Sequence, residues 1–390
     1  MAEDSPNSHS VLSFSPDQLT PGMRQYQEVK QVHPDCLVML RMGDFYEMFY
    51  EDAITAAREL EITLTARGTG EKRAPLAGVP FHALETYLAR LIKKGHKVAI
   101  VEQLEDPKMA KGLVKRGLVR IVTPGTIIES SLLQEKENNY IIALTSFKDS
   151  FALACCDLST GEFFTQSMEG MPYVLHELAR LHPSECVIPQ SLGVNKELKE
   201  KVKSSGCFLT TYEDHYFQLE KSRTALLEHF KMNSLQSFGL EDYPRLISAA
   251  GALLQYLLHT QRNALPHIKR VTVRSDAVTM VLDSSTLRNL ELMKNLREGT
   301  MKGTLLAVLD ATVTSMGGRL LRRWITEPLL QRKAIETRLN AVEELTKKVI
   351  LREEMRDLLQ NMYDLERLMG RINYGTATPR DVVALRHSLS

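Results

Sequence analysis

The sequence predicts a multidomain protein in which two successive α/β units precede an all-helical unit. Three observations predict this order. Helix-like and strand-like apolar runs alternate between residues 20 and 126. A second alternating stretch then opens with several β-branched runs separated by tight turns, and from Thr286 onward only helical periods remain. A chain of 390 residues, 43% of them hydrophobic, can form several domains of ordinary size without metal or disulfide cross-links.

The first unit, residues 20–126, is expected to be a small mixed α/β domain, preceded by a polar, disordered tail at residues 1–19. Thr20-Pro21 has the residue types of an N-cap and a first helical position. Pro124-Gly125 is expected to close the domain. The patterns predict helices at 22–32, 53–60 and 82–94, strands at 36–41, 62–65, 98–101 and 118–122, and a polar loop at 67–75.

The second unit, residues 127–275, begins with strands and then alternates, which indicates another α/β domain. Ser159-Thr160-Gly161 is predicted to be the turn of a β-hairpin. The patterns predict strands at 140–145, 151–157, 162–166 and 185–188, and helices at 173–181 and 245–261 with further helices between them.

The third unit, residues 276–390, is expected to be an α-helical domain. Helical periods occur at 305–324, 332–348 and 351–368. Thr378-Pro379 begins one more helix, for which no C-cap precedes the end of the chain. We therefore expect this domain to be truncated here and to continue in a longer protein.

The composition indicates a cytoplasmic protein without cross-links or membrane segments. The cysteines are odd in number and show no CxxC spacing, which argues against a disulfide framework and against a zinc module. The N-terminus lacks the apolar stretch of a signal peptide, and no apolar run reaches the roughly 20 residues of a membrane span. The cysteines are Cys36, Cys155, Cys156, Cys186 and Cys207.

The net charge of +1 conceals an uneven distribution of charge. Residues 28–61 carry eight acids and three bases, whereas residues 67–120 carry twelve bases and five acids. A basic stretch of this kind suits contact with a local polyanion, although a solvated helix face and loop is the alternative interpretation. Its acid-free part contains Lys108, Lys111, Lys115, Arg116 and Arg120.

Catalytic signatures are mostly missing from the sequence. No Gly-Lys pair occurs, so this chain has no P-loop for ATP, and neither GxSxG nor HExxH is present. Asp157 ends an apolar strand beside the predicted hairpin, where ribonuclease-H-like folds place a first metal-binding carboxylate. Only Glu162 follows it on the next strand, whereas two-metal chemistry needs several carboxylates together. We therefore interpret Asp157 as a turn-stabilising residue, and expect no metal or cofactor in this chain.

The Phe45-Tyr46-Glu47 segment is the most unusual feature of the chain. On a strand, Phe45 and Glu47 face the same side. An aromatic ring and a carboxylate on one exposed face suit nucleic-acid bases, because the ring can stack on or wedge between them and the carboxylate can accept a hydrogen bond from a base edge. Alternatively, Phe45, Phe49 and Tyr50 are core aromatics and Glu47 is their solvated neighbour.

Many motifs in one order resemble the bacterial-type MutS family, from about residue 20 to the end. The resemblance implies a mismatch-recognition domain, a connector domain that is ribonuclease-H-like in fold but not a nuclease, and the first part of a helical lever domain. The motifs are Arg41 to Phe49, Ala77 to Ala83, Glu102-Gln103 with Asp106-Pro107, Val119 to Thr126, Asp157 to Glu162, Asp283 to Thr286, Asn289 to Leu292, Thr304 to Trp324 and Gly370-Arg371.

The resemblance implies recognition of mismatched or looped-out bases in duplex DNA during mismatch repair. The parent protein would be a homodimer, associated with the nucleoid in the cytoplasm, that uses ATP and Mg²⁺ in a domain absent from this chain. It would signal to MutL, and the sliding clamp is a further candidate partner. A MutS-like relative that acts in recombination is the alternative, although such relatives generally lack the aromatic-x-Glu pair; a ribonuclease-H-type nuclease is another.

The resemblance also assigns roles to particular residues. Phe45 would be the wedge that unstacks a weakened base step, and Glu47 would reject paired bases and accept a hydrogen bond from a displaced one. Tyr46, which points the other way along the strand, is expected in the core. Basic residues nearby would contact the DNA backbone and fix its register; they are Arg67, Lys115, Arg116 and Arg120.

Overall fold

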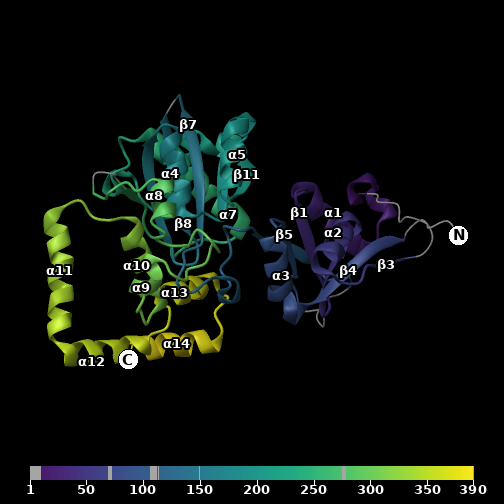
Figure 1. Cartoon of the computed structure of the whole chain (residues 1–390). Coiled ribbons are helices and arrows are strands. Elements are labelled where there is room, and N and C mark those ends of the chain that lie inside the picture. Colours follow the sequence, from purple (N-terminus) through teal and green to yellow (C-terminus); the bar gives the residue numbers. More distant parts are fainter. Residues whose placement is uncertain are drawn as a thin grey trace. The chain divides into compact units, whose positions relative to one another are not determined.

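The computed structural model describes residues 10–68, 73–105, 112, 114–148, 150–274 and 278–389. It contains two compact units, which are described separately (Figure 1). Unit 1 comprises the residues up to Leu132 together with Leu258–Ala264, and unit 2 comprises Leu133–Leu257 together with the residues from Leu265 onward.

Unit 1 is built on a six-stranded mixed sheet with the strand order β3-β4-β2-β1-β5-β6. The β1–β5 pair is parallel, and the other pairs are antiparallel. The strands are β1 (Cys36–Met42), β2 (Phe45–Phe49), β3 (Thr65–Arg67), β4 (Ala74–Pro80), β5 (Lys97–Gln103) and β6 (Arg116–Val122); the helices are α1 (Pro21–Val32), α2 (Tyr50–Leu60) and α3 (Leu84–Lys93).

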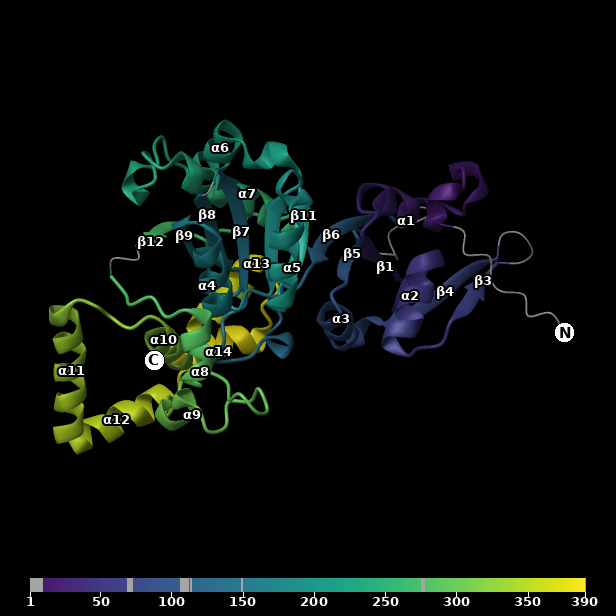
Figure 2. The ribbon, with the colours of Figure 1, turned by 45° about the horizontal axis from the view of Figure 1, so that its top comes forward.

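Helix α1 lies on one face of this sheet, and α2 and α3 lie on the other (Figure 2). Each face has its own apolar core. One core contains Val38, Leu40 and Phe49, which pack with Tyr26 of α1. The other contains residues of α2 and α3. It also contains the side chains of β1 and β2 that point to this second face, among them Tyr46. The period of two along β1 and β2 therefore decides which residues face α1 and which face α2 and α3.

Most of the elements predicted for residues 20–126 are confirmed, but β4 is not among them. The predicted loop at 67–75 covers its first two residues, and no element is predicted for the others. Pro75, Gly78 and Pro80 interrupt the sequence of this strand, and such residues usually mark turns. Its buried residues nevertheless alternate, with Ala77 and Val79 in the core. The predicted strand at 62–65 lies three residues later, as β3, because α2 ends at Leu60 and a short connection follows.

Unit 2 contains a second six-stranded mixed sheet with the order β11-β10-β7-β8-β9-β12. Its central hairpins β7–β8 and β8–β9 are antiparallel, as predicted, and Gly161 in the second turn has the positive φ of 79° that favours glycine. The strands are β7 (Tyr140–Phe147), β8 (Ser150–Asp157), β9 (Glu162–Glu169), β10 (Glu185–Pro189), β11 (Phe208–Tyr212) and β12 (Thr272–Arg274); the helices are α4 (Met171–Leu181), α5 (Lys196–Ser204), α6 (Leu219–Phe230) and α7 (Pro244–Gln261).

The remainder of unit 2 is helical, but two of its predicted helices are each divided in two. Thr314 caps α10 by accepting a hydrogen bond from the Gly317 amide at 3.0 Å, and Asp364 caps α13 by accepting one from the Arg367 amide at 3.2 Å. Both residues are good N-caps, which is why a helix restarts after each. The helices are α8 (Ser284–Asn289), α9 (Leu305–Leu309), α10 (Ser315–Thr326), α11 (Arg332–Lys347), α12 (Val349–Gln360), α13 (Leu365–Tyr374) and α14 (Pro379–Leu389).

The predicted order of α/β units followed by helices is confirmed. Two mixed β-sheets with their helices come first, and a helical region follows them. Strands β11 and β12 were not predicted; β12 has only three residues. Within the part of the chain that the structure describes, no helix is both long and apolar enough to cross a membrane.

Candidate nucleic-acid interface

Strand β2 is fixed by neighbours on both sides. Its partner β1 is joined to it by a tight turn in which Gly43 has a φ of 60°, and Arg41 Nε donates to the Gly43 carbonyl at 2.5 Å. On the other side, Phe45 pairs with Pro80 and Glu47 pairs with Gly78 of β4. This double pairing sets the register of β2, so the faces presented by its side chains are not free to exchange.

The aromatic residues of β2 divide between core and surface. Phe49 is 1% exposed and packs edge-to-face on Tyr26 of α1, with ring centroids 5.3 Å apart. Phe45 lies on the same face but is 46% exposed. Tyr46 points to the opposite face, is buried, and donates to Glu102. The core interpretation is therefore right for Phe49 and Tyr50, which are buried, and wrong for Phe45.

Gly78 keeps the surface beside Phe45 and Glu47 open. A Cβ atom at this position would lie 3.7 Å from Phe45 Cδ1 and 3.9 Å from Glu47 Cγ, which is van der Waals contact with both. Any larger side chain on β4 would cover the space between the ring and the carboxylate. The glycine thus leaves the two side chains accessible from the same direction.

Glu47 is held by an arginine in this structure. Arg67 Nη1 lies 2.9 Å from Glu47 Oε2, with the Arg67 side chain half exposed and the Glu47 side chain 20% exposed. Burial raises the pKa of Glu47, and the positive charges of Arg67 and Arg116 offset part of that rise. The carboxylate beside the exposed ring is thus partly desolvated and already paired with a residue predicted to contact DNA.

The other basic residues predicted to contact DNA differ in their surroundings. Arg116 connects neighbouring segments of unit 1. Its Nε donates to the Arg41 carbonyl at 2.6 Å, and its Nη1 donates to Val114 O at 3.0 Å and to Gln25 Oε1 at 3.2 Å. Burial lowers the pKa of Arg116. Arg120 forms an ion pair with Glu129.

Lys115 is exposed immediately before β6. Lys108 and Lys111, which belong to the same basic stretch, lie outside the described residues. Of the four predicted contacts, Arg67 and Lys115 have the most accessible side chains, whereas Arg116 and Arg120 also serve the fold.

A second exposed aromatic residue lies next to this site. Phe81 is 43% exposed, and its amide donates to the Asp44 carbonyl at 2.9 Å, which places it beside the start of β2. The guanidinium of Arg41 lies over its ring at 3.9 Å from the centroid. Sequence reasoning included Phe81 and Arg41 only within longer motifs. The sequence carries no separate signal for Phe81, because the strand that it follows, β4, is itself not predicted from the sequence.

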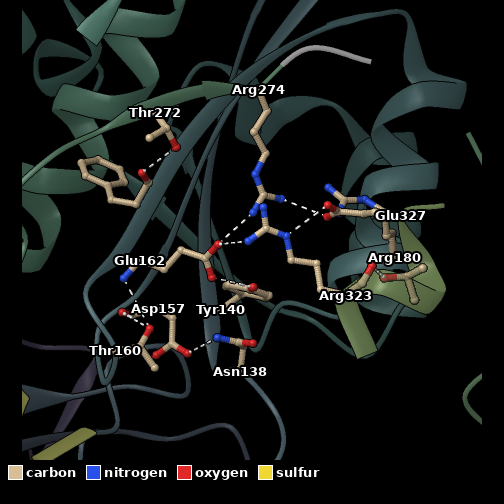
Figure 3. Close-up of polar contacts among 12 residues, drawn as sticks. Asn138, Tyr140, Asp157, Thr160, Glu162, Arg180, Thr272, Arg274, Arg323 and Glu327 are labelled. Atoms are coloured by element: carbon tan, nitrogen blue, oxygen red, sulfur yellow. Dashed lines mark hydrogen bonds and ion pairs between the residues drawn. The ribbon is translucent and has the colours of Figure 1, made fainter. Parts of the chain in front are cut away.

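Asp157 has the turn-stabilising role predicted for it (Figure 3). It is fully buried, and Oδ1 accepts from the Ser159 amide at 2.9 Å and from the Ser159 hydroxyl at 2.7 Å. Oδ2 accepts from Asn138 Nδ2 at 2.8 Å and from the Asn139 amide at 3.2 Å. These four donors occupy both carboxylate oxygens, which weighs against the nuclease alternative.

The carboxylate of Glu162 is engaged by arginines (Figure 3). Arg274 lies 2.8 Å from Glu162 Oε1, and Tyr140 donates to Oε2 at 2.9 Å. Arg274 also lies 3.1 Å from Glu327, which pairs with Arg180 and Arg323 as well. The network joins β9 and β12 to α4 and α10. In the described ranges, no three or more His, Cys, Asp or Glu side chains cluster as a metal ion would need.

Comparison with known proteins gives matches along most of the chain. Three domain models match in order: MutS domain I at residues 20–131, MutS domain II at 139–269 and MutS domain III at 285–390. The chain is 49% identical over 378 residues to the DNA mismatch repair protein MutS of Halothermothrix orenii, covering 95% of this chain and 42% of that protein. It is 47% identical to the protein of the same name from Methanosarcina acetivorans, covering 95% and 43%. The chain therefore spans about two fifths of the length of these relatives.

The different burial of two phenylalanines on β2 predicts different stabilities. Phe45→Ala should lower the free energy of unfolding by less than about 1 kcal/mol, because the ring is half exposed. Phe49→Ala removes a buried ring from the same strand and face and should cost about 3–5 kcal/mol. Urea unfolding of both variants measures this difference; equal losses would place Phe45 in the core.

The Glu327 network predicts a stability that depends on pH. Burial alone would raise the pKa of Glu327, but Arg180, Arg274 and Arg323 outweigh it and leave this pKa below its usual value. Glu327→Gln should therefore cost about 2–3 kcal/mol at neutral pH. The difference from wild type should persist down to the ordinary glutamate pKa and vanish as the pH falls through the depressed value.

Denaturant unfolding at several pH values measures this difference. The matched control is Glu336→Gln, since Glu336 pairs with Arg332 on the surface of α11 and should contribute less than about 1 kcal/mol. A difference for Glu327→Gln that grows on acidification would contradict the assignment.

Proposed function

The chain belongs to the MutS family, and from this premise we propose that it recognises mismatched or looped-out bases in duplex DNA, with Phe45 as the wedge and Glu47 beside it. The observation that carries the proposal is the exposed ring of Phe45 on a strand whose other aromatic residues are buried. A fixed, exposed ring next to a carboxylate is a surface suited to an unstacked base.

Wedging discriminates through the deformability of DNA. Separating two stacked base pairs costs on the order of a few kcal/mol, and the cost falls where a mispair or a bulge has already weakened the step. A rigid wedge is favoured for this task, because a mobile ring would lose conformational entropy on insertion. The pairing of β2 with both β1 and β4 supplies that rigidity at Phe45. One site could thereby accept many different mispairs.

Glu47 supplies a penalty against paired DNA. A carboxylate brought close to phosphates and paired bases is repelled and desolvated, and only a displaced base offers a donor that offsets this cost. Arg67 neutralises Glu47 in the structure. We propose that Arg67 turns to a phosphate on binding, which leaves Glu47 to the bases. Lys115 would contact the backbone directly, and Arg116 and Arg120 would do so from within their internal contacts.

We propose that the rest of the chain connects this site to the parent protein. Residues 20–126 would be the recognition domain, 127–275 a ribonuclease-H-like connector, and 276–390 the first part of a lever domain. The sequence has no Gly-Lys pair to hold nucleotide phosphates, so ATP and Mg²⁺ do not fit this chain and would belong to another part of the parent. The parent would act as a cytoplasmic, nucleoid-associated homodimer with MutL, and with the sliding clamp as a further candidate partner.

Two substitutions separate the roles of wedge and carboxylate. Phe45→Ala should abolish the preference of the chain for a duplex with one G·T pair over a matched duplex, because no ring remains to unstack the step. Glu47→Ala should instead tighten binding to the matched duplex several-fold, because a repulsive charge is lost and Arg67 is freed for a phosphate. Fluorescence anisotropy titrations of both duplexes measure these changes.

The matched control for charge is Glu61→Ala, which removes one exposed carboxylate at the end of α2. It should affect the two duplexes alike and less than Glu47→Ala does. A Phe45→Ala variant that keeps full preference would disprove the wedge. Weaker matched-duplex binding by folded Glu47→Ala would disprove the repulsion.

A further inference from the structure

The segment Gln134–Glu137 lies at the start of unit 2, two residues after Leu132, which ends the first part of unit 1. It is held by other side chains of unit 2. Arg367 of α13 donates to the Gln134 carbonyl at 2.9 Å and to the Glu137 carbonyl at 2.6 Å. Arg319 of α10 donates to the Glu135 carbonyl at 2.9 Å. Two arginines from different helices therefore bind three backbone carbonyls within four consecutive residues.

Both arginines are buried, with side chains 4% and 5% exposed for Arg319 and Arg367. Arg319 is also paired with Asp364 at 2.7 Å and with Glu366 at 2.6 Å. Arg367 has its nearest carboxylate, that of Asp364, at 3.9 Å, so its close hydrogen bonds go to the segment. Burial lowers the pKa of Arg367. If the segment left, a buried guanidinium would lose its acceptors, which is costly.

The segment contributes its own side chains to the same contact. Lys136 Nζ lies 3.0 Å from Asp310 Oδ1 and donates to the Thr312 carbonyl at 3.0 Å. Gly318 of α10 faces this lysine, because a Cβ atom there would lie 2.6 Å from Lys136 Cγ. The α10 backbone thus approaches the segment more closely than a larger residue would permit.

We propose that Arg319 and Arg367 are positioning residues for the connection between the recognition domain and unit 2. They hold the segment Gln134–Glu137, which we call the tether, and we call their contacts with it the lock. This inference rests on the proposed function. Ordering four backbone residues costs conformational entropy. Because the lock orders them when the protein folds, this entropy is not lost again when DNA binds. A preorganised tether should favour engagement of any duplex equally, because it touches neither the wedge nor the bases. Its loss should lower affinity and leave the preference for a mismatch unchanged.

The first test needs no DNA. A glutamate-specific protease cuts after Glu135 and Glu137 only when the segment opens. Arg367→Gln in the complete 390-residue chain should speed these cuts at least tenfold. Lys136→Met, which leaves the buried arginines in place, should speed them several-fold. Arg24→Gln is the matched control, because Arg24 also donates to a backbone carbonyl, that of Leu19 in unit 1, at 3.3 Å, and it should change nothing. Unchanged cutting in Lys136→Met and in folded Arg367→Gln would overturn the lock.

The second test uses duplexes with and without one G·T pair, below the melting temperature of each variant. Arg367→Gln should weaken binding to both at least threefold and keep their ratio. Faster cutting with unchanged affinity for both duplexes, or a changed ratio, would overturn the positioning role. A wild-type chain that binds both duplexes equally, while the protease results hold, would refute the proposed function and leave the lock intact.

Discussion

The arrangement of the candidate site depends on the register of one five-residue strand. Tyr46 and Met48 of β2 are buried in the core with α2 and α3, so the alternation of a strand places Phe45 and Glu47 on the opposite face. A slip by one residue would expose Tyr46 and bury the carboxylate of Glu47, which is why the register is strongly specified. The surface pair is thus a consequence of how the core is packed.

Several charged side chains of this protein stabilise the fold. Arg319 and Arg367 hold backbone carbonyls, and Arg116 braces β1 against β6 and α1. Arg67 differs, because its half-exposed side chain is paired with a single carboxylate that is itself part of the candidate site. An arginine that is half exposed and held by one carboxylate can be exchanged for a phosphate more easily than a buried arginine can.

The sequence was sufficient for elements with strong local signals. Helix α14 begins where Thr378 and Pro379 predict it, and the β8–β9 turn lies at Gly161. Strand β4 was missed because its prolines and glycine obscure an alternation that only pairing with β2 and β3 reveals. Within the site, spacing predicted that Phe45 and Glu47 share a face, and the family resemblance supplied their roles. Neither could show that Arg120 is paired with Glu129 or that Arg67 holds Glu47, since both contacts depend on tertiary structure.

Insertion of the Phe45 ring can be observed directly with 2-aminopurine placed beside a G·T pair, because this base analogue fluoresces more strongly when it is unstacked. At saturating protein, the wild-type chain should raise the fluorescence of the mismatched duplex and leave that of a matched duplex nearly unchanged. Phe45→Ala at saturation should produce little rise on either duplex. An equal rise with wild type and Phe45→Ala on the mismatched duplex would show that the base step opens without the ring, and would contradict a wedge at this position.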